Sequence, residues 1–154
     1  MKKFVSLVIF FLCLAMTAPC FAETVSADNV SVRVIKEWVS EKYGCKIDND
    51  GDLVVTKDGS KSFVQVIPKA KVVRIFSQYS PYDKLTHSEM VKLANKFNQD
   101  KRLLRVYVKS DKTSVCDYYI IYDGGLNSEN MLEALRWFMS LKKDWCDYVI
   151  KAAE

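Results

Sequence analysis

Residues 128–151, SENMLEALRWFMSLKKDWCDYVIK, are the stretch of this sequence that decides its fold. The polar residues of this stretch recur at steps of three and four and so form one narrow stripe along a helix: Glu129, Glu133, Arg136, Ser140, Lys143, Asp147 and Lys151. Apart from Asn130, Lys142 and Asp144, the rest of the circumference is apolar. A surface helix needs an apolar face of only about 100°. The pattern therefore predicts a long terminal helix that packs on a sheet and also against a further partner.

Two partners for this surplus apolar surface are open. The first is another helix of the same chain. The second is a second copy of the protein, in which case a homodimer would be formed through Trp137, Leu141 and Tyr148.

The chain before this helix alternates between helical and strand-like patterns. Thr86 and Glu89 have the spacing of a capping box, which predicts a helix that begins near His87. An amphipathic pattern indicates an earlier helix over residues 30–43, with Gly44 as its C-terminal cap. Strand patterns bounded by turn residues occupy residues 53–56, 61–67, 71–79, 103–109 and 113–122. The order α-β-β-β-α-β-β-α predicts an α+β fold in which helices pack on a five-stranded antiparallel sheet.

The N-terminus has the pattern of a secretory signal peptide. Lys2 and Lys3 precede an apolar run over residues 4–16, and the small residues Cys20 and Ala22 lie at positions −3 and −1 before Glu23. The run is shorter than the about 20 residues that a membrane-spanning helix needs. We expect cleavage after Ala22 and a periplasmic or secreted protein. Lipidation of Cys20 is the alternative.

Removal of residues 1–22 leaves 132 residues, the size of one ordinary domain, and lowers the net charge from +4 to +2. We expect residues 23–29 to form a flexible arm and residues 30–154 to form a single domain. Charges of both signs are mixed along the chain, which gives no indication of nucleic-acid binding. A second apolar span is absent from the sequence, so no integral membrane segment is expected after cleavage.

The mature sequence contains three cysteines, Cys45, Cys116 and Cys146. The strand from Cys116 to Tyr122 covers about 20 Å, and the helix from Ser128 to Cys146 covers about 27 Å. If the helix folds back over its strand, both cysteines lie near the same end. Two buried thiols without a bridge are the favoured expectation, and Cys116–Cys146 is the pair that we predict if a disulfide forms in an oxidising compartment.

Candidate chemical groups are few. Residues 48–52 (DNDGD) alternate carboxylates but lack the glycine and the glutamate that an EF-hand calcium loop requires. His87 is the only histidine and is expected on the surface, at the first turn of a helix. We predict no metal, no cofactor and no catalytic residue. A small thiol-dependent or hydrolytic enzyme is the less favoured alternative.

Aromatic residues are more numerous in the predicted strands than one sheet face can bury, because strand side chains alternate between two faces. Some should therefore be exposed, where tyrosine is suited to protein contacts. The expected partner-binding residues are Phe76, Tyr107, Tyr118 and Tyr122.

Several short segments resemble the YbjN-like proteins, which are described as bacterial sensory transduction regulators and whose fold is similar to that of type III secretion chaperones. The matching segments are Tyr43 with residues 50–55, residues 95–98 (NKFN), residues 105–108 (RVYV), and residues 124–126 (GGL) with 129–132 (ENML). The resemblance implies a chaperone-like domain, often dimeric, without established catalytic residues. The signal peptide and the lack of acidic character depart from the cytosolic chaperones.

The resemblance also draws attention to Asn95 and Asn98. We expect structural roles for both: Asn98 would end its helix in a left-handed conformation, and Asn95 would bond to nearby backbone. The sequence as a whole predicts an exported, non-enzymatic protein-binding or chaperone-like module. An accessory regulator of envelope stress or signal transduction is the alternative, and it rests on the resemblance alone.

Overall fold

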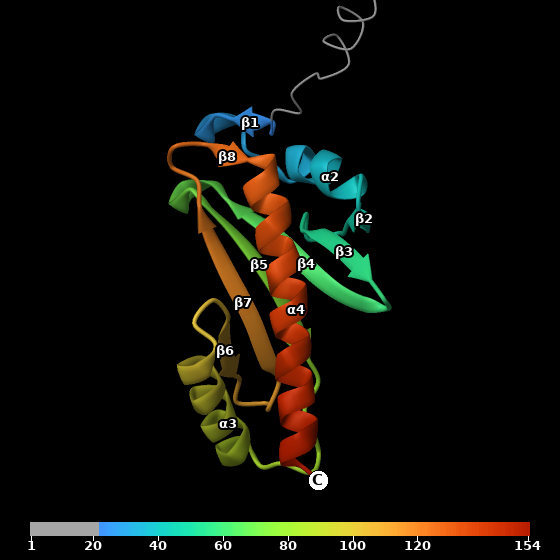
Figure 1. Cartoon of the computed structure of the whole chain (residues 1–154), viewed down its shortest axis with the longest axis vertical. Helices are drawn as coiled ribbons and strands as arrows, with labels where there is room; N and C mark the ends of the chain where they lie inside the picture. Colours follow the sequence, from blue (N-terminus) through green and yellow to red (C-terminus); the bar gives the residue numbers. More distant parts are fainter. Residues whose placement is uncertain (1–21) are drawn as a thin grey trace, which may run out of the picture.

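The computed structural model describes residues 22–154, which form a curved antiparallel sheet with one long helix lying along it (Figure 1). The sheet has six strands in the order β2-β3-β4-β5-β7-β6. Their bounds are Gly44–Ile47 (β2), Leu53–Lys57 (β3), Ser60–Ile67 (β4), Val72–Tyr79 (β5), Arg105–Val108 (β6) and Ser114–Ile121 (β7). A separate antiparallel pair joins β1 (Thr24–Val25) to β8 (Leu126–Asn127).

Residues 22–154 also contain three α-helices: α2 (Val32–Ser40), α3 (His87–Asp100) and α4 (Ser128–Ala152). The predicted capping box is present at the start of α3, where Thr86 and Glu89 bond each other's backbone N–H groups. Asn127 caps α4 by accepting a hydrogen bond from the N–H of Asn130 at 3.1 Å. The α+β fold and the order of its main elements are confirmed.

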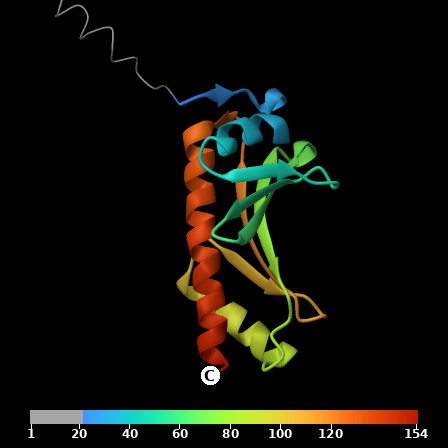
Figure 2. The same ribbon diagram turned by 90° about the vertical axis from the view of Figure 1, so that its right-hand side faces the viewer.

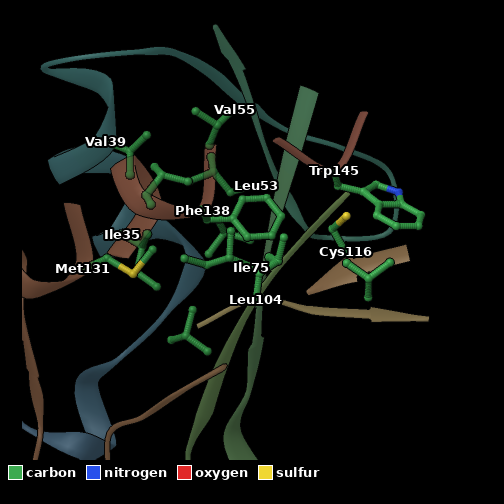
Figure 3. Packing of buried hydrophobic residues seen from close by; sticks show 14 of the residues in the cluster. Ile35, Val39, Leu53, Val55, Ile75, Leu104, Cys116, Met131, Phe138 and Trp145 are labelled. Carbon is green, nitrogen blue, oxygen red and sulfur yellow. The ribbon is translucent and has the colours of Figure 1, made fainter. Parts of the chain in front are cut away.

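The core lies between α4 and the sheet face that α4 covers, which we call the inner face. Met131, Leu135, Phe138 and Trp145 of α4 are each at most 1% exposed. Figure 3 shows several of these side chains meeting residues from the sheet. The remaining helices also pack against α4, with α2 on its N-terminal half and α3 on its C-terminal half (Figure 1). Much of the surplus apolar surface of α4 is thus covered within the chain.

The sheet has one strand more than predicted. Gly44 was expected to cap a helix, but α2 ends at Ser40 and Gly44 begins β2, which pairs with β3. The acidic segment 48–52 therefore connects two strands, with Gly51 at a φ of 84° in the turn. Because β2 is a short edge strand of four residues, it lacks the apolar alternation by which longer strands are recognised.

Residues 23–29 do not form the expected flexible arm. Thr24 and Val25 pair with β8, and residues Ala27–Asn29 form one 3-10 turn. Glu23 accepts a hydrogen bond from the Trp38 indole at 2.6 Å, and its carbonyl accepts one from Ser128 N at 2.8 Å. The N-terminal end of the predicted mature chain is therefore attached to both α2 and α4.

The second face of the sheet, which we call the outer face, carries no helix of residues 22–154 (Figure 2). Val54, Phe76 and Val115 point to this face and are nevertheless at most 7% exposed, although they do not belong to the main core cluster. Neighbouring side chains on the same face must therefore cover them. This second layer contains the candidate site.

Candidate functional site

Six residues from three adjacent strands gather on the outer face and form what we call the outer-face cluster. Strand pairing places Asp117 opposite both Phe76 and Arg105, and Tyr119 opposite Arg74. Directly paired residues point to the same face of a sheet. The members of the cluster are Arg74, Phe76, Arg105, Tyr107, Asp117 and Tyr119.

Asp117 organises the cluster. Its carboxylate is completely buried and accepts hydrogen bonds from Arg105 Nε at 2.8 Å, from Arg105 Nη2 at 2.7 Å and from Arg74 Nη2 at 3.0 Å. The hydroxyl of Tyr119 donates a further bond to Asp117 at 3.1 Å. The two bonds from Arg105 make a bidentate pair, the arrangement that fixes a guanidinium most firmly. A buried carboxylate thus holds two arginines and a tyrosine in fixed positions on an open sheet face.

The aromatic rings lie against the two guanidinium groups. The Arg74 guanidinium lies 4.4 Å from the centre of the Phe76 ring, and that of Arg105 lies 5.3 Å from the centres of the Tyr107 and Tyr119 rings. Contacts of this kind are attractive because the ring face is electronegative. Two cations share one carboxylate, so the cluster carries a net positive charge. Its surface combines that charge with exposed aromatic area.

The surroundings shift the acid–base equilibria of two members. Hydrogen bonding to Asp117 raises the pKa of Arg105 above its ordinary value. Burial, followed by the negative charge of Asp117, raises the pKa of Tyr119. Both groups therefore keep their neutral-pH forms into more alkaline solution, and the cluster presents an unchanged set of donors across the physiological range.

The structure brings together only part of the predicted partner-binding set. Phe76 and Tyr107 lie in the outer-face cluster, whereas Tyr118 points to the inner face and Tyr122 is 1% exposed in the core. Tyr119, which was not among the predicted residues, is 42% exposed on the outer face. The face of each tyrosine follows from its register position in β7, which the sequence alone did not specify.

The three residues predicted for a dimer interface lie on different parts of α4. Trp137 is 46% exposed, and Leu141 is half-buried beside it. Tyr148 instead packs inside the chain, with its ring 5.7 Å from that of Phe97 and 6.3 Å from that of Trp145. Trp137 and Leu141 share a small hollow with Leu103. A homodimer remains a proposal.

Asn98 has a structural role that differs from the predicted one. The helix α3 continues past it to Asp100, and Asn98 does not adopt a left-handed conformation. Its side-chain amide donates to the carbonyl of Val106 at 2.8 Å and accepts from the N–H of Val106 at 2.8 Å. The amide therefore pairs with the edge strand β6 as a neighbouring strand would. Asn95 is exposed on α3.

Lys142 of α4 is a buried cation that the apolar pattern left unexplained, with only 3% of its surface exposed. Its ammonium donates hydrogen bonds to the carbonyl of Lys61 at 2.7 Å, to Ser62 Oγ at 2.8 Å and to Ser77 Oγ at 3.4 Å. Burial lowers the pKa of Lys142 to about 8. The inner face thus accepts one charged group in a polar niche that contains one serine of β4 and one of β5.

Cys45, Cys116 and Cys146, the cysteines of the described part of the chain, are free thiols. Cys116 is fully buried and Cys146 is half-buried, and burial raises the pKa of both thiols. Each interacts electrostatically with Lys142, so the two thiols lie in the same region of the inner face. The Cys116–Cys146 bridge stays a prediction for oxidising conditions.

The remaining sequence candidates lie apart from the cluster. His87 is exposed at the first turn of α3. Asp48 accepts bonds from the N–H groups of Asp50 and Asp52 at 3.1 and 3.0 Å, which makes the acidic segment a closed turn. Within residues 22–154, histidine, cysteine and acidic side chains do not gather in any group of three or more that could hold a metal ion.

No helix in the described part of the chain is both long and apolar enough to cross a membrane. The predicted signal peptide, residues 1–22, lies almost entirely outside the described residues.

Four members of the cluster, Arg74, Arg105, Asp117 and Tyr119, were not among the predicted site residues. Asp117 interrupts the otherwise apolar run of β7, and Arg74 does the same in β5. A charged residue in the middle of a central strand is the signal that could have identified both, because such a residue is rarely buried without a partner.

Comparison with known proteins assigns the fold and the family. A family model described as "Putative bacterial sensory transduction regulator", YbjN, matches residues 31–151. The crystal structure of YbjN from E. coli has a TM-score of 0.64 at 9% identity and covers 75% of this chain and 88% of its own. A chain of the HopA1–SchA chaperone–effector complex has a TM-score of 0.55 at 7% identity, covering 77% and 92%. A search of curated proteins finds no match.

These likenesses confirm the predicted resemblance in fold. The family model extends over nearly the whole described chain, from the start of α2 to the end of α4, and includes every strand of the six-stranded sheet. This chain belongs to the YbjN family.

Proposed function

We propose that this protein is an exported, non-enzymatic module that binds another protein through the outer face of its sheet. The observation that carries the proposal is the outer-face cluster: a buried Asp117 holds Arg74 and Arg105 among aromatic rings on a face that no helix of residues 22–154 covers. Arginine and tyrosine are enriched where proteins bind each other, especially when they are held rigid before binding. The likeness to a chaperone–effector complex supports the fold on which such a surface would be built.

The cluster also indicates the chemistry of the partner. Two guanidinium groups and one carboxylate leave a net positive charge, and Arg105 keeps 59% of its side chain exposed. Aromatic and cationic groups on a rigid surface favour a partner segment with carboxylates beside apolar side chains.

Removal of the exposed aromatic area should abolish partner binding. The protein is purified with an affinity tag from its own host. We expect the amount of partner that co-purifies with the Tyr107→Ala, Tyr119→Ala double variant to be at least tenfold lower than with the wild type. Ile150→Ala is the matched control, because Ile150 is 46% exposed and Tyr119 is 42% exposed. Equal recovery from the double variant and the wild type would count against the outer face.

Export is part of the proposal. The expected product in the periplasmic or extracellular fraction begins at Glu23, which intact mass spectrometry can measure directly. A mature chain that carries lipid on Cys20, or a chain that retains residues 1–22 in the cytoplasm, would contradict this expectation.

A regulatory role in signal transduction is the second candidate, favoured by the description of the matching family. Such a role is compatible with protein binding, because a regulator without a catalytic site acts through its partners. An unchanged envelope stress response in a deletion strain would argue against it.

A further inference from the structure

The edge of the sheet next to the outer-face cluster is only half covered. Strand β7 runs over Ser114–Ile121, but β6 pairs with it only from Ser114 to Asp117. Before Arg105 the chain turns away toward α3 instead of continuing along β7. Figure 1 shows the upper half of β7 at the border of the sheet, with no strand beyond it.

The backbone of this segment points outward at two residues. The N–H of Tyr122 bonds to Lys71 on the β5 side, and the carbonyl of Thr113 accepts from Lys109 on the β6 side. Backbone groups alternate in direction along a strand, so odd-numbered residues of β7 face the β6 side. Beyond Asp117 these residues are Tyr119 and Ile121. Within residues 22–154, no strand pairs with them on that side.

The neighbouring edge is closed in a different way. The side chain of Asn98 bonds both the N–H and the carbonyl of Val106 on the outward side of β6. Exposed strand edges invite pairing with other chains, and proteins usually cover them. The chain therefore covers the edge of β6 and leaves the edge of β7 open at the adjacent position.

The open edge has apolar side chains on both faces. On the inner side, Tyr118 lines a hollow together with Leu103 and Trp137, which are 54% and 46% exposed. On the outer side, Ile121 is 77% exposed. An open depression of about 330 Å³, which Tyr118 and Leu103 also line, continues toward the start of β6. A strand laid against β7 would fill this groove with alternate side chains.

The charges around the open edge of β7 indicate which kind of segment would pair with it. The same depression is lined by Lys101, Arg102 and Arg105. Lys101 pairs with Asp144 at 2.9 Å and Arg105 with Asp117, whereas Arg102 makes no ion pair within residues 22–154 and keeps its positive charge uncompensated. Two copies of this chain paired edge to edge would bring these cations toward each other, whereas an acidic segment would meet them favourably.

We propose that Tyr119 and Ile121 of β7 accept an extended segment of the partner protein as an added strand. Residues of that segment opposite Tyr118 and Ile120 are apolar and enter the hollow beside Trp137. A residue opposite Tyr119 lies on the outer side next to Arg105 and is acidic. This inference rests on the proposed function and specifies how the partner is bound: main-chain bonds give affinity and alternate side chains give specificity.

The test measures amide hydrogen exchange in purified ¹⁵N-labelled protein with a synthetic peptide, acetyl-Thr-Val-Glu-Val-Thr-Val-Thr-amide. We expect the amides of Tyr119 and Ile121 to exchange at least tenfold more slowly with saturating peptide. A peptide with lysine in place of glutamate should bind at least fivefold more weakly.

Two variants separate backbone pairing from side-chain contact. Ile121→Pro removes the outward N–H at a position where proline is tolerated, and should weaken peptide binding at least fivefold. Ile121→Ala retains the N–H and should stay within threefold of the wild type.

Equal exchange rates with and without peptide would overturn the proposal, and so would equal binding by the proline and alanine variants. Protection of Tyr119 and Ile121 that depends on protein concentration, without peptide, would show a second copy as the occupant and would also overturn it. The experiments distinguish strand addition from the proposed function. Partner recovery that survives Ile121→Pro but is lost in the Tyr107→Ala, Tyr119→Ala variant would contradict strand addition and leave outer-face binding intact.

Discussion

Replacing Asp117 by asparagine is expected to lower the free energy of unfolding by about 2–3 kcal/mol. The carboxylate is fully buried and receives bonds from Arg74, Arg105 and Tyr119. The asparagine amide nitrogen would face guanidinium donors, and the half-buried Arg74 would lose its ion pair with Asp117. Urea unfolding followed by circular dichroism measures this loss. Without the carboxylate, the side chains of Arg74, Arg105 and Tyr119 should also no longer be held in fixed positions.

A matched substitution on the other side of the ion pair should cost much less. Arg105→Met leaves Asp117 paired with Arg74, and the Arg105 side chain is 59% exposed, so its charge is already partly solvated. Because Asp117 also keeps the bond from Tyr119, we expect a loss of about 1 kcal/mol. A loss of less than 1 kcal/mol for Asp117→Asn, or losses of equal size for both variants, would contradict the central role given to Asp117.

Lys142 should give the protein a characteristic dependence of stability on pH. Its pKa is about 8 in the folded state, against an ordinary value of 10.5. Between these two pH values the unfolded chain therefore holds a proton on Lys142 that the folded chain has released. The contribution of Lys142 to stability then increases with pH across this window, by at most about 1.4 kcal/mol per pH unit. Below pH 8 both states are protonated, and the contribution of Lys142 becomes constant.

The Lys142→Met variant should lose this increase in stability between pH 8 and pH 10. The thiols of Cys116 and Cys146 and the hydroxyl of Tyr79 have raised pKa values, so at alkaline pH the folded chain keeps protons that the unfolded chain loses, and these groups lower stability with rising pH in wild type and variant alike. The difference in stability between the wild type and Lys142→Met therefore isolates the contribution of Lys142. Lys143→Met is the control, because the side chain of Lys143 is 75% exposed. Urea titrations at pH 7, 8, 9 and 10 give the comparison. Identical pH profiles for wild type and Lys142→Met would show that Lys142 is not the titrating group.

The parts of the fold that follow from local chemistry could be predicted from the sequence. The capping box of Thr86 and Glu89 fixed the start of α3, and the long apolar helix identified α4. Strand β2 and the β1–β8 pair escaped prediction, because each is too short to show alternation and depends on a partner far along the chain.

The candidate site depended on register more than on residue type. Tyr118 and Tyr119 are chemically identical, yet one points to α4 and the other to the open face, because successive strand residues alternate. Composition indicated exposed tyrosines but gave no way to choose among them. The buried polar residues show the same dependence on pairing. Asp117 is buried because Arg74 of another strand bonds to it, and Lys142 is buried because Ser62 and Ser77 of the sheet accept its hydrogen bonds.

The most direct test of the outer face is photo-crosslinking in living cells. p-Benzoylphenylalanine placed at Tyr119 samples the outer face, and the same residue placed at Lys143 samples the exposed side of α4. We predict a discrete crosslinked product with a different protein from position 119 and none from position 143. Equal products from both positions, or a product from position 119 that contains only two copies of this chain, would contradict partner binding by the outer face.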